Sequence, residues 1–244
     1  AGYSVSRTGI RFLAAAGFLA AAISVRLSWQ ESFPAQIYDV KAAIRRLRAH
    51  AGDYPIDPAR IGLMGDSAGG HLAALAALTG DNPDLEGDSR LTRIFHRRTG
   101  VRGDQREFRF PQPDLDTDHA PPANPIRFCR DLHPGDAFAQ LFGGPLRERA
   151  DLMRLASPIR YVNRTAPPFL IIHGTRDETV PFEQGQRLHH ALQTAGADTT
   201  LIPIEGGHHN LRDQPDLPYG GEIWDDVTDR TVEFFRRHLE RQAA

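Results

Sequence analysis

The stretch Ile61-Gly62-Leu63-Met64-Gly65-Asp66-Ser67-Ala68-Gly69-Gly70-His71-Leu72 decides how the rest of the chain is interpreted. A short apolar run enters a Gly-x-Ser-x-Gly motif, and a segment rich in Ala and Leu follows. This order predicts a strand, a sharp turn and a helix, an arrangement that places a nucleophilic serine at the tip of the turn. Gly65 and Gly69 have no Cβ atoms, so the chain can turn tightly and the helix can pack close to the strand. The alternative is a glycine-rich turn in which Ser67 only caps a helix.

A nucleophilic serine needs a base and an orienting acid, and for this kind of turn they follow in the order acid, then histidine. Asp177 comes after the apolar run 168–172, which predicts a buried strand. His208 comes after a second predicted strand over 201–204. Both side chains would lie beyond the carboxyl ends of their strands, where open α/β sheets place their sites. The predicted triad is therefore Ser67, Asp177 and His208, with the adjacent His209 as the competing base.

These motifs make the chain similar to the α/β-hydrolase esterases of the bifunctional feruloyl/acetyl-xylan esterase-like family. The matching segments are 33–40, 57–61, 65–72, 156–158, 173–181 and 206–208. The resemblance implies an α/β-hydrolase fold, a mostly parallel sheet with helices on both faces. It also implies a serine esterase that hydrolyses acetyl, feruloyl or similar carboxylic esters. Ser67 would be the nucleophile, Asp177 the acid, and His208 the base because it directly follows a glycine pair.

The expected oxyanion hole combines two backbone N–H groups. One belongs to Ala68, directly after the nucleophile, and the other to Gly2. Residues 1–4 resemble the end of a His-Gly-Gly-Gly loop of the family, and the strands that precede this loop have no counterpart here. The resemblance thus implies an N-terminally incomplete fold. Restoring upstream residues is expected to raise both the melting temperature and the ester turnover.

A length of 244 residues suits one α/β-hydrolase domain over 1–244. The hydrophobic pattern predicts helices over 34–50, 68–78, 182–195 and 223–239. The nearly all apolar stretch from Ile10 to Val25 has Arg7 and Arg11 at its start and resembles a signal peptide, but Gly17 divides it. A short helix over 10–16 and a core strand over 18–25 is the favoured interpretation. No stretch is long enough to span a membrane.

Residues 81–140 break the family pattern and predict an irregular, cap-like insertion. Residues 90–109 contain seven arginines and no run of four apolar residues. A solvated loop is the favoured interpretation. A nucleic-acid surface lacks the aromatic residues and the recognised module that it would need. A local change of reading frame in the gene is the third interpretation.

The composition excludes several classes of function. A net charge of −2 indicates no polyanionic partner, so neither nucleic acid nor a membrane surface is expected. The single cysteine, Cys129, excludes an internal disulfide and leaves the compartment open. No phosphate loop or dinucleotide motif is present, so no cofactor is expected. Glu205, His208 and His209 could suggest metal ligands, but their spacing does not match a zinc-protease helix, and no metal is expected.

Three rival functions share the predicted triad. A prolyl-oligopeptidase-type peptidase and a lipase use the same three residue types, although the propeller domain of that peptidase is missing. A non-catalytic α/β-hydrolase fragment is the third. The expected partner is a small-molecule or polysaccharide ester, and the sequence does not indicate which ester or which oligomeric state.

Overall fold

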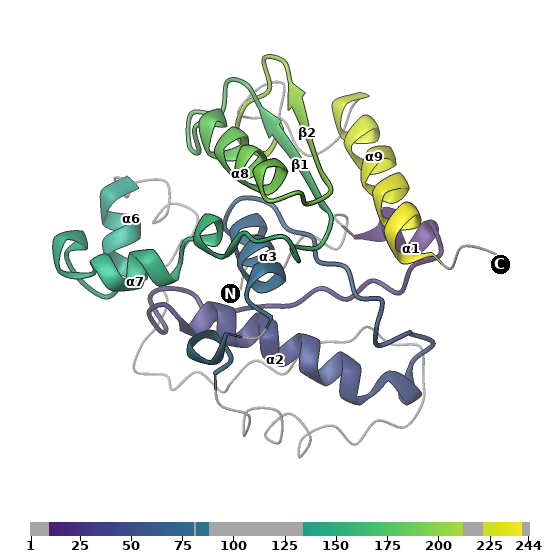
Figure 1. Ribbon diagram of the computed structural model, residues 1–244, viewed down its shortest axis with the longest axis horizontal. Coiled ribbons are helices and arrows are strands. Elements are labelled where there is room, and N and C mark those ends of the chain that lie inside the picture. Colours follow the sequence, from purple (N-terminus) through teal and green to yellow (C-terminus); the bar gives the residue numbers. More distant parts are fainter. Residues whose placement is uncertain (1–9, 81, 88–133, 212–221, 241–244) are drawn as a thin grey trace, which may run out of the picture. The chain divides into compact units, whose positions relative to one another are not determined.

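The computed structural model describes residues 10–80, 82–87, 134–211 and 222–240 (Figure 1). They divide into two compact units. The first contains 10–55, 82–87 and 134–156, and the second contains 56–80, 157–211 and 222–240. The predictions for Gly2, Cys129 and residues 90–109 fall on residues outside the described ranges. The assignment of 1–244 to a single domain stays a prediction.

The regular elements among the described residues of the first unit are all helical. Its helices are α1 (Arg11–Ala15), α2 (Ala35–Ala49), α6 (Pro134–Leu141) and α7 (Ala150–Leu155), and its single 3-10 turns are η1 (Ala51–Asp53), η2 (Pro83–Leu85) and η3 (Leu146–Glu148). Helix α1 confirms the short helix predicted over 10–16. Of the predicted insertion at 81–140, the described ends form η2 and most of α6, while residues 88–133 lie outside the described ranges.

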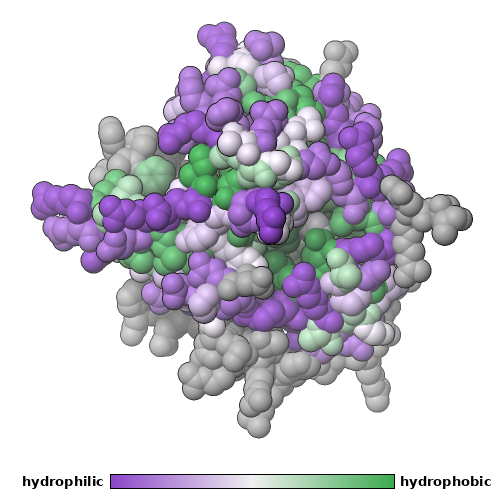
Figure 2. Space-filling view, viewed as in Figure 1, coloured by the Kyte–Doolittle hydropathy of each residue, from purple (hydrophilic) through white to green (hydrophobic). Residues whose placement is uncertain are grey.

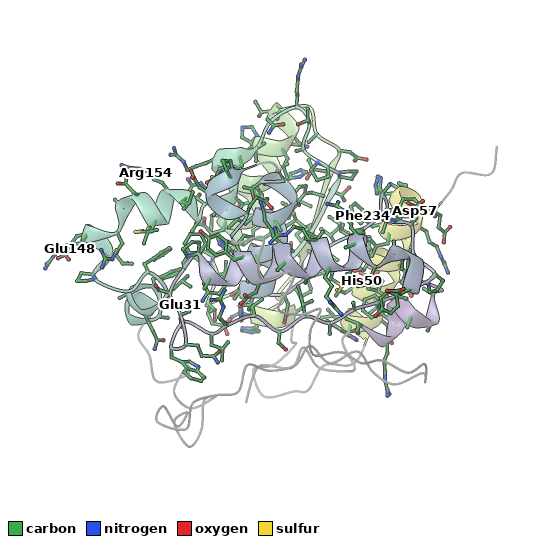
Figure 3. All side chains as sticks on the ribbon, turned by 90° about the horizontal axis from the view of Figure 1, so that it is seen from below. Glu31, His50, Asp57, Glu148, Arg154 and Phe234 are labelled. Atoms are coloured by element: carbon green, nitrogen blue, oxygen red, sulfur yellow. The ribbon has the colours of Figure 1, made fainter. Side chains whose placement is uncertain are left out.

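Helix α2 confirms the amphipathic helix predicted over 34–50, and Figure 3 labels Glu31 and His50 near its two ends. Ile37 and Val40, on the predicted apolar stripe, are buried. Charged contacts tie neighbouring segments to the helix. The Arg26 guanidinium contacts the Asp39 carboxylate at 2.8 Å, and Glu86 accepts hydrogen bonds from Lys41 and Arg45. These contacts anchor the segments around Arg26 and Glu86 on α2.

The second unit is built on two parallel strands. They are β1 (Phe169–Gly174) and β2 (Thr199–Ile204), in a register that pairs Phe169 with Thr199 and Gly174 with Ile204. Parallel strands need a crossover connection, and α8 (Phe182–Thr194) supplies it. Figure 1 shows α8 and α9 (Glu222–Leu239) on opposite sides of the strands. Both strands and both helices confirm predicted elements.

The core of this unit centres on three buried side chains, Leu78, Phe169 and Leu192. Leu78 ends α3 (Ala68–Leu78), and α3 also contacts η4 (Pro158–Tyr161). On α9, Val227, Thr231 and Phe235 are buried, as the helical pattern predicts. On the face shown in Figure 2, hydrophilic side chains cover most of the described surface and hydrophobic ones form small patches between them.

The predicted sheet is larger than the observed one. Among the described residues the sheet has two strands, and neither 18–25 nor 61–64 is a strand. Both segments are apolar enough to suggest strands, but a strand also needs a neighbour that satisfies its backbone N–H and C=O groups. The ladder of hydrogen bonds in the described residues joins β1 to β2 alone. The two observed strands are parallel, as predicted. In the part of the chain that the structure describes, however, the sheet has fewer strands than predicted.

Candidate active site

Ser67 occupies the sharp turn that the sequence predicts. Its backbone has φ 49° and ψ −121°, in a region that non-glycine residues rarely adopt, and helix α3 begins at the next residue. The Asp66 carbonyl accepts hydrogen bonds from the N–H groups of Gly69 (2.7 Å) and Gly70 (3.1 Å), which closes the turn into the helix. Such strain is characteristic of functional positions, and it leaves the Ser67 side chain exposed.

The turn requires glycine at Gly65, as predicted. It does not require glycine at Gly69 for the predicted steric reason. A Cβ atom on Gly65 would collide with the backbone of Gly69, so no larger residue fits there. A Cβ atom on Gly69 would meet nothing within 4 Å, whereas one on Gly70 would lie 3.1 Å from the Gly65 carbonyl oxygen. The close approach therefore joins Gly65 to the peptide group between Gly69 and Gly70, and a side chain at 69 would not obstruct it.

We expect Gly65→Ala to destabilise the protein by about 1–3 kcal/mol, the usual effect of forcing an extra carbon into a packed site. Gly69→Ala is the matched control, because its Cβ atom points into open space and alanine favours helix. Thermal unfolding of both variants measures the difference. Equal melting temperatures for the two would contradict the assignment of the close contact to Gly65.

Asp177 lies in the loop after β1, where the local backbone holds its carboxylate. Its Oδ1 accepts hydrogen bonds from the N–H groups of Thr179 (2.9 Å) and Val180 (2.8 Å), the pattern of an Asx turn. The Asp177 side chain is 6% exposed. Partial burial raises its pKa, but hydrogen bonds from Val180, His209 and Thr179 and the nearby His209 outweigh it, so the pKa of Asp177 lies below its ordinary value. The carboxylate is therefore charged over the range in which a histidine titrates.

His209 joins this carboxylate to the serine. Its Nδ1 lies 2.9 Å from Asp177 Oδ2, and its Nε2 lies 3.0 Å from Ser67 Oγ. A carboxylate only accepts, so Nδ1 carries the proton that is shared with Asp177. Nε2 is then free to accept a hydrogen bond from the Ser67 hydroxyl. All three residues belong to the second unit.

The structure contradicts the prediction that His208 contacts the serine and the acid. His208 Nδ1 lies instead 3.1 Å from Glu178 Oε2, so the adjacent histidine pairs with the adjacent acid. Among the described contacts, His209 alone bridges Ser67 and Asp177. In the sequence, the pair Gly206-Gly207 favoured His208 as the base. In the structure, this pair lets the chain pass close to the end of β1.

That passage depends on backbone contacts between the two loops. A Cβ atom on Gly174, the last residue of β1, would collide with the Gly207 carbonyl, and it would lie 2.9 Å from that of His208. The N–H of Arg176 donates to the Gly207 carbonyl (3.0 Å), while Gly206 has φ +71°. The loop reaches the carboxyl end of β1 in this way, and η5 (His209–Leu211) begins with the bridging histidine.

One of the two expected oxyanion donors can be placed. Ala68 is the first residue of α3, where a backbone N–H has no acceptor within the helix. It directly follows Ser67, as a donor to a developing oxyanion must. Gly2, the other expected donor, lies outside the described residues.

No group of three His, Cys, Asp or Glu side chains in the described part of the chain is arranged to hold a metal ion. Glu205 instead accepts a hydrogen bond from the Thr175 hydroxyl (3.3 Å), and His208 and His209 face Glu178 and Asp177. Over the same described ranges, no helix is both long and apolar enough to cross a membrane.

Known proteins are similar to this chain in sequence and in fold. The mycobacterial esterase LipQ (Mycobacterium tuberculosis) is 32% identical over 79% of this chain, which spans 42% of the LipQ length. The solved structure of a truncated carbohydrate esterase from gut microbiota is 31% identical, with a TM-score of 0.62 over 90% of this chain and 74% of its own. An acetyl ester-xyloside bifunctional hydrolase from Caldicellulosiruptor lactoaceticus shares the fold alone, with a TM-score of 0.63 at 22% identity over 95% of this chain and 76% of its own.

The family match covers most of the chain and includes two of the three residues that the structure brings together. The BD-FAE family matches residues 3–192, a range that contains Ser67 and Asp177. His209 lies beyond that range and is identified by its contacts. The chain therefore belongs to the BD-FAE family, an α/β-hydrolase family of esterases.

Proposed function

We propose that this protein is a serine esterase that hydrolyses carboxylic esters through Ser67, His209 and Asp177. The observation that carries the proposal is the unbroken line of contacts from the Asp177 carboxylate through the His209 ring to the Ser67 hydroxyl. A serine hydroxyl is a weak nucleophile at neutral pH and needs an adjacent base of this kind. The strained turn at Ser67 and the membership of an esterase family support the same function.

The contacts assign a role to each residue in the proposed reaction. His209 Nε2 takes the Ser67 proton as Oγ attacks the ester carbonyl, and the same proton is passed to the leaving alcohol. Asp177 keeps the Nδ1–H tautomer and stabilises the imidazolium. The N–H of Ala68 donates to the oxyanion. Water then attacks the acyl-enzyme with His209 again as base, which releases the acid and restores Ser67.

For the acyl group we propose acetyl esters of plant polysaccharides or similar small esters. The proposal rests on the similar structure described as a truncated carbohydrate esterase and on the membership of the BD-FAE family. Turnover of acetylated xylan should therefore exceed that of p-nitrophenyl esters with long acyl chains. A preference for long chains would favour a lipase instead, and methyl ferulate in the same panel tests the feruloyl alternative.

The nucleophile can be identified by covalent labelling. A fluorophosphonate probe should add to Ser67, with loss of fluoride, and peptide mass spectrometry should find the adduct on that residue. The wild-type protein should hydrolyse p-nitrophenyl acetate, whereas Ser67→Ala should not react with the probe and should lose about 10⁶ in turnover of the ester. Equal turnover by the variant and the wild type would reject the proposed function.

A further inference from the structure

A second histidine faces the acid of the triad. His173 is the fifth residue of β1, and its Nε2 lies 3.3 Å from Asp177 Oδ2 and 2.9 Å from the Val180 carbonyl oxygen. The His173 side chain is 13% exposed. None of the proposed chemical steps involves this ring. Of the three triad residues, His173 contacts Asp177 alone.

The contact with the Val180 carbonyl shows that Nε2 of His173 carries a hydrogen. A backbone carbonyl can only accept a hydrogen bond, so His173 Nε2 carries a hydrogen. The same nitrogen lies 3.3 Å from Asp177 Oδ2, which also accepts a hydrogen bond from His209 Nδ1 at 2.9 Å. The other carboxylate oxygen, Oδ1, is held by the N–H groups of Thr179 and Val180. Backbone N–H groups thus hold one oxygen of Asp177, and two imidazole rings flank the other.

Helix α8 leaves room for this ring. A Cβ atom on Gly185 would lie 2.7 Å from His173 Nδ1, and the Phe182 ring packs edge-on against the imidazole with centroids 5.6 Å apart. Glycine in a helix interior is unfavourable, and Gly185 is buried within a helix of 13 residues. Gly185 therefore weakens helix α8 but leaves space for the imidazole of His173.

We propose that His173 is a positioning residue: its ring is anchored by the Nε2–H bond to the Val180 carbonyl, lies 3.3 Å from Asp177 Oδ2, and so fixes the orientation of the Asp177 carboxylate and of His209. This inference rests on the proposed function, because it assigns His173 a role only through the triad. The hydrogen bond to Val180 anchors the ring to the loop that carries Asp177. Together with the two bonds to Oδ1, it opposes rotation of the carboxylate away from His209.

The first test compares an apolar and a donor-bearing replacement. His173→Leu should lower kcat for p-nitrophenyl acetate about tenfold or more with KM unchanged, since small displacements of catalytic groups carry penalties of this size. His173→Gln places an amide N–H near the position of Nε2 and should recover most of the lost kcat. His189 is the matched control, since its ring bonds to Thr199 on β2, away from the triad. His189→Leu should leave kcat unchanged.

The second test displaces the ring without changing any polar group. Gly185→Ala should lower kcat in the wild-type background, because the added methyl group pushes on His173. In a His173→Ala background the same change should cause no further loss. This cycle separates contact with the ring from a general effect on α8. Equal losses in both backgrounds would overturn the proposal.

All rates should be divided by the concentration of sites that react with the fluorophosphonate probe, so that misfolded protein is not counted. If His173→Leu labels at Ser67 and keeps the wild-type kcat, the inference is wrong while the proposed function stands. If the wild-type protein forms no adduct on Ser67, the proposed function itself fails. A loss in His173→Leu that glutamine does not restore would also contradict the inference, because it would indicate packing rather than hydrogen bonding.

Discussion

Replacing His209 with alanine should lower kcat for p-nitrophenyl acetate by about 10⁶, the loss expected when the base of a serine hydrolase is removed. The physical reason is the position of its Nε2, 3.0 Å from Ser67 Oγ, where it can take the hydroxyl proton. Alanine leaves no acceptor there. The residual rate would come from substrate binding and the oxyanion donor. Steady-state kinetics on the purified variant measures the effect.

His208→Ala is the matched control, because it removes the same side chain one residue earlier. His208 pairs with Glu178, and the two side chains are 26% and 57% exposed. Exposed pairs of this kind contribute little to stability. We therefore expect His208→Ala to stay close to the wild type in both kcat and melting temperature. The reverse ranking of the two variants would reassign the base to His208.

The Ser67→Ala variant adds a check on cooperation within the triad. Because the serine and the histidine act as a unit, the Ser67→Ala/His209→Ala double variant should lose no more than either single variant. Additive losses would mean that the two side chains act independently. That result would contradict the contact between Oγ and Nε2 as the path of the proton.

Asp177→Asn should lower kcat by about 10⁴, the scale seen when a triad histidine is held in the wrong tautomer. Asp177 Oδ1 accepts from the N–H groups of Thr179 and Val180, so the amide oxygen of asparagine will take its place. The amide NH₂ then occupies the position of Oδ2 and points at His209 Nδ1. A donor at that position places the imidazole proton on Nε2, which can no longer accept the proton of Ser67.

Glu178→Gln is the matched control for this change. It removes a negative charge from the next residue in the same loop, but Glu178 contacts His208 and not the bridging histidine ring. We expect its kcat to remain near that of the wild type. The two variants are compared by kcat per reactive site. A similar loss in both would indicate that the charge of the loop matters more than the tautomer of His209.

The sequence by itself determined the parts of the protein that depend on local patterning. The glycine-flanked serine, the strand before Asp177 and the strand before His208 and His209 all follow from short runs of residues, and the structure places them as predicted. The helices over 35–49, 182–194 and 222–239 follow from the spacing of apolar residues. These signals suffice because each element satisfies its own backbone or buries one face.

Only the tertiary structure decided which of two adjacent histidines faces the serine. Residues 208 and 209 carry the same side chain, so residue type cannot separate them. The choice depends on Gly207, whose carbonyl receives the Arg176 N–H and whose backbone packs on Gly174. That contact sets the path of the loop and turns His209 toward Asp177. The contact of Gly65 with the peptide group between Gly69 and Gly70, and the space that Gly185 leaves for His173, likewise appear only once the chain is folded, because they are contacts between residues and not properties of either residue alone.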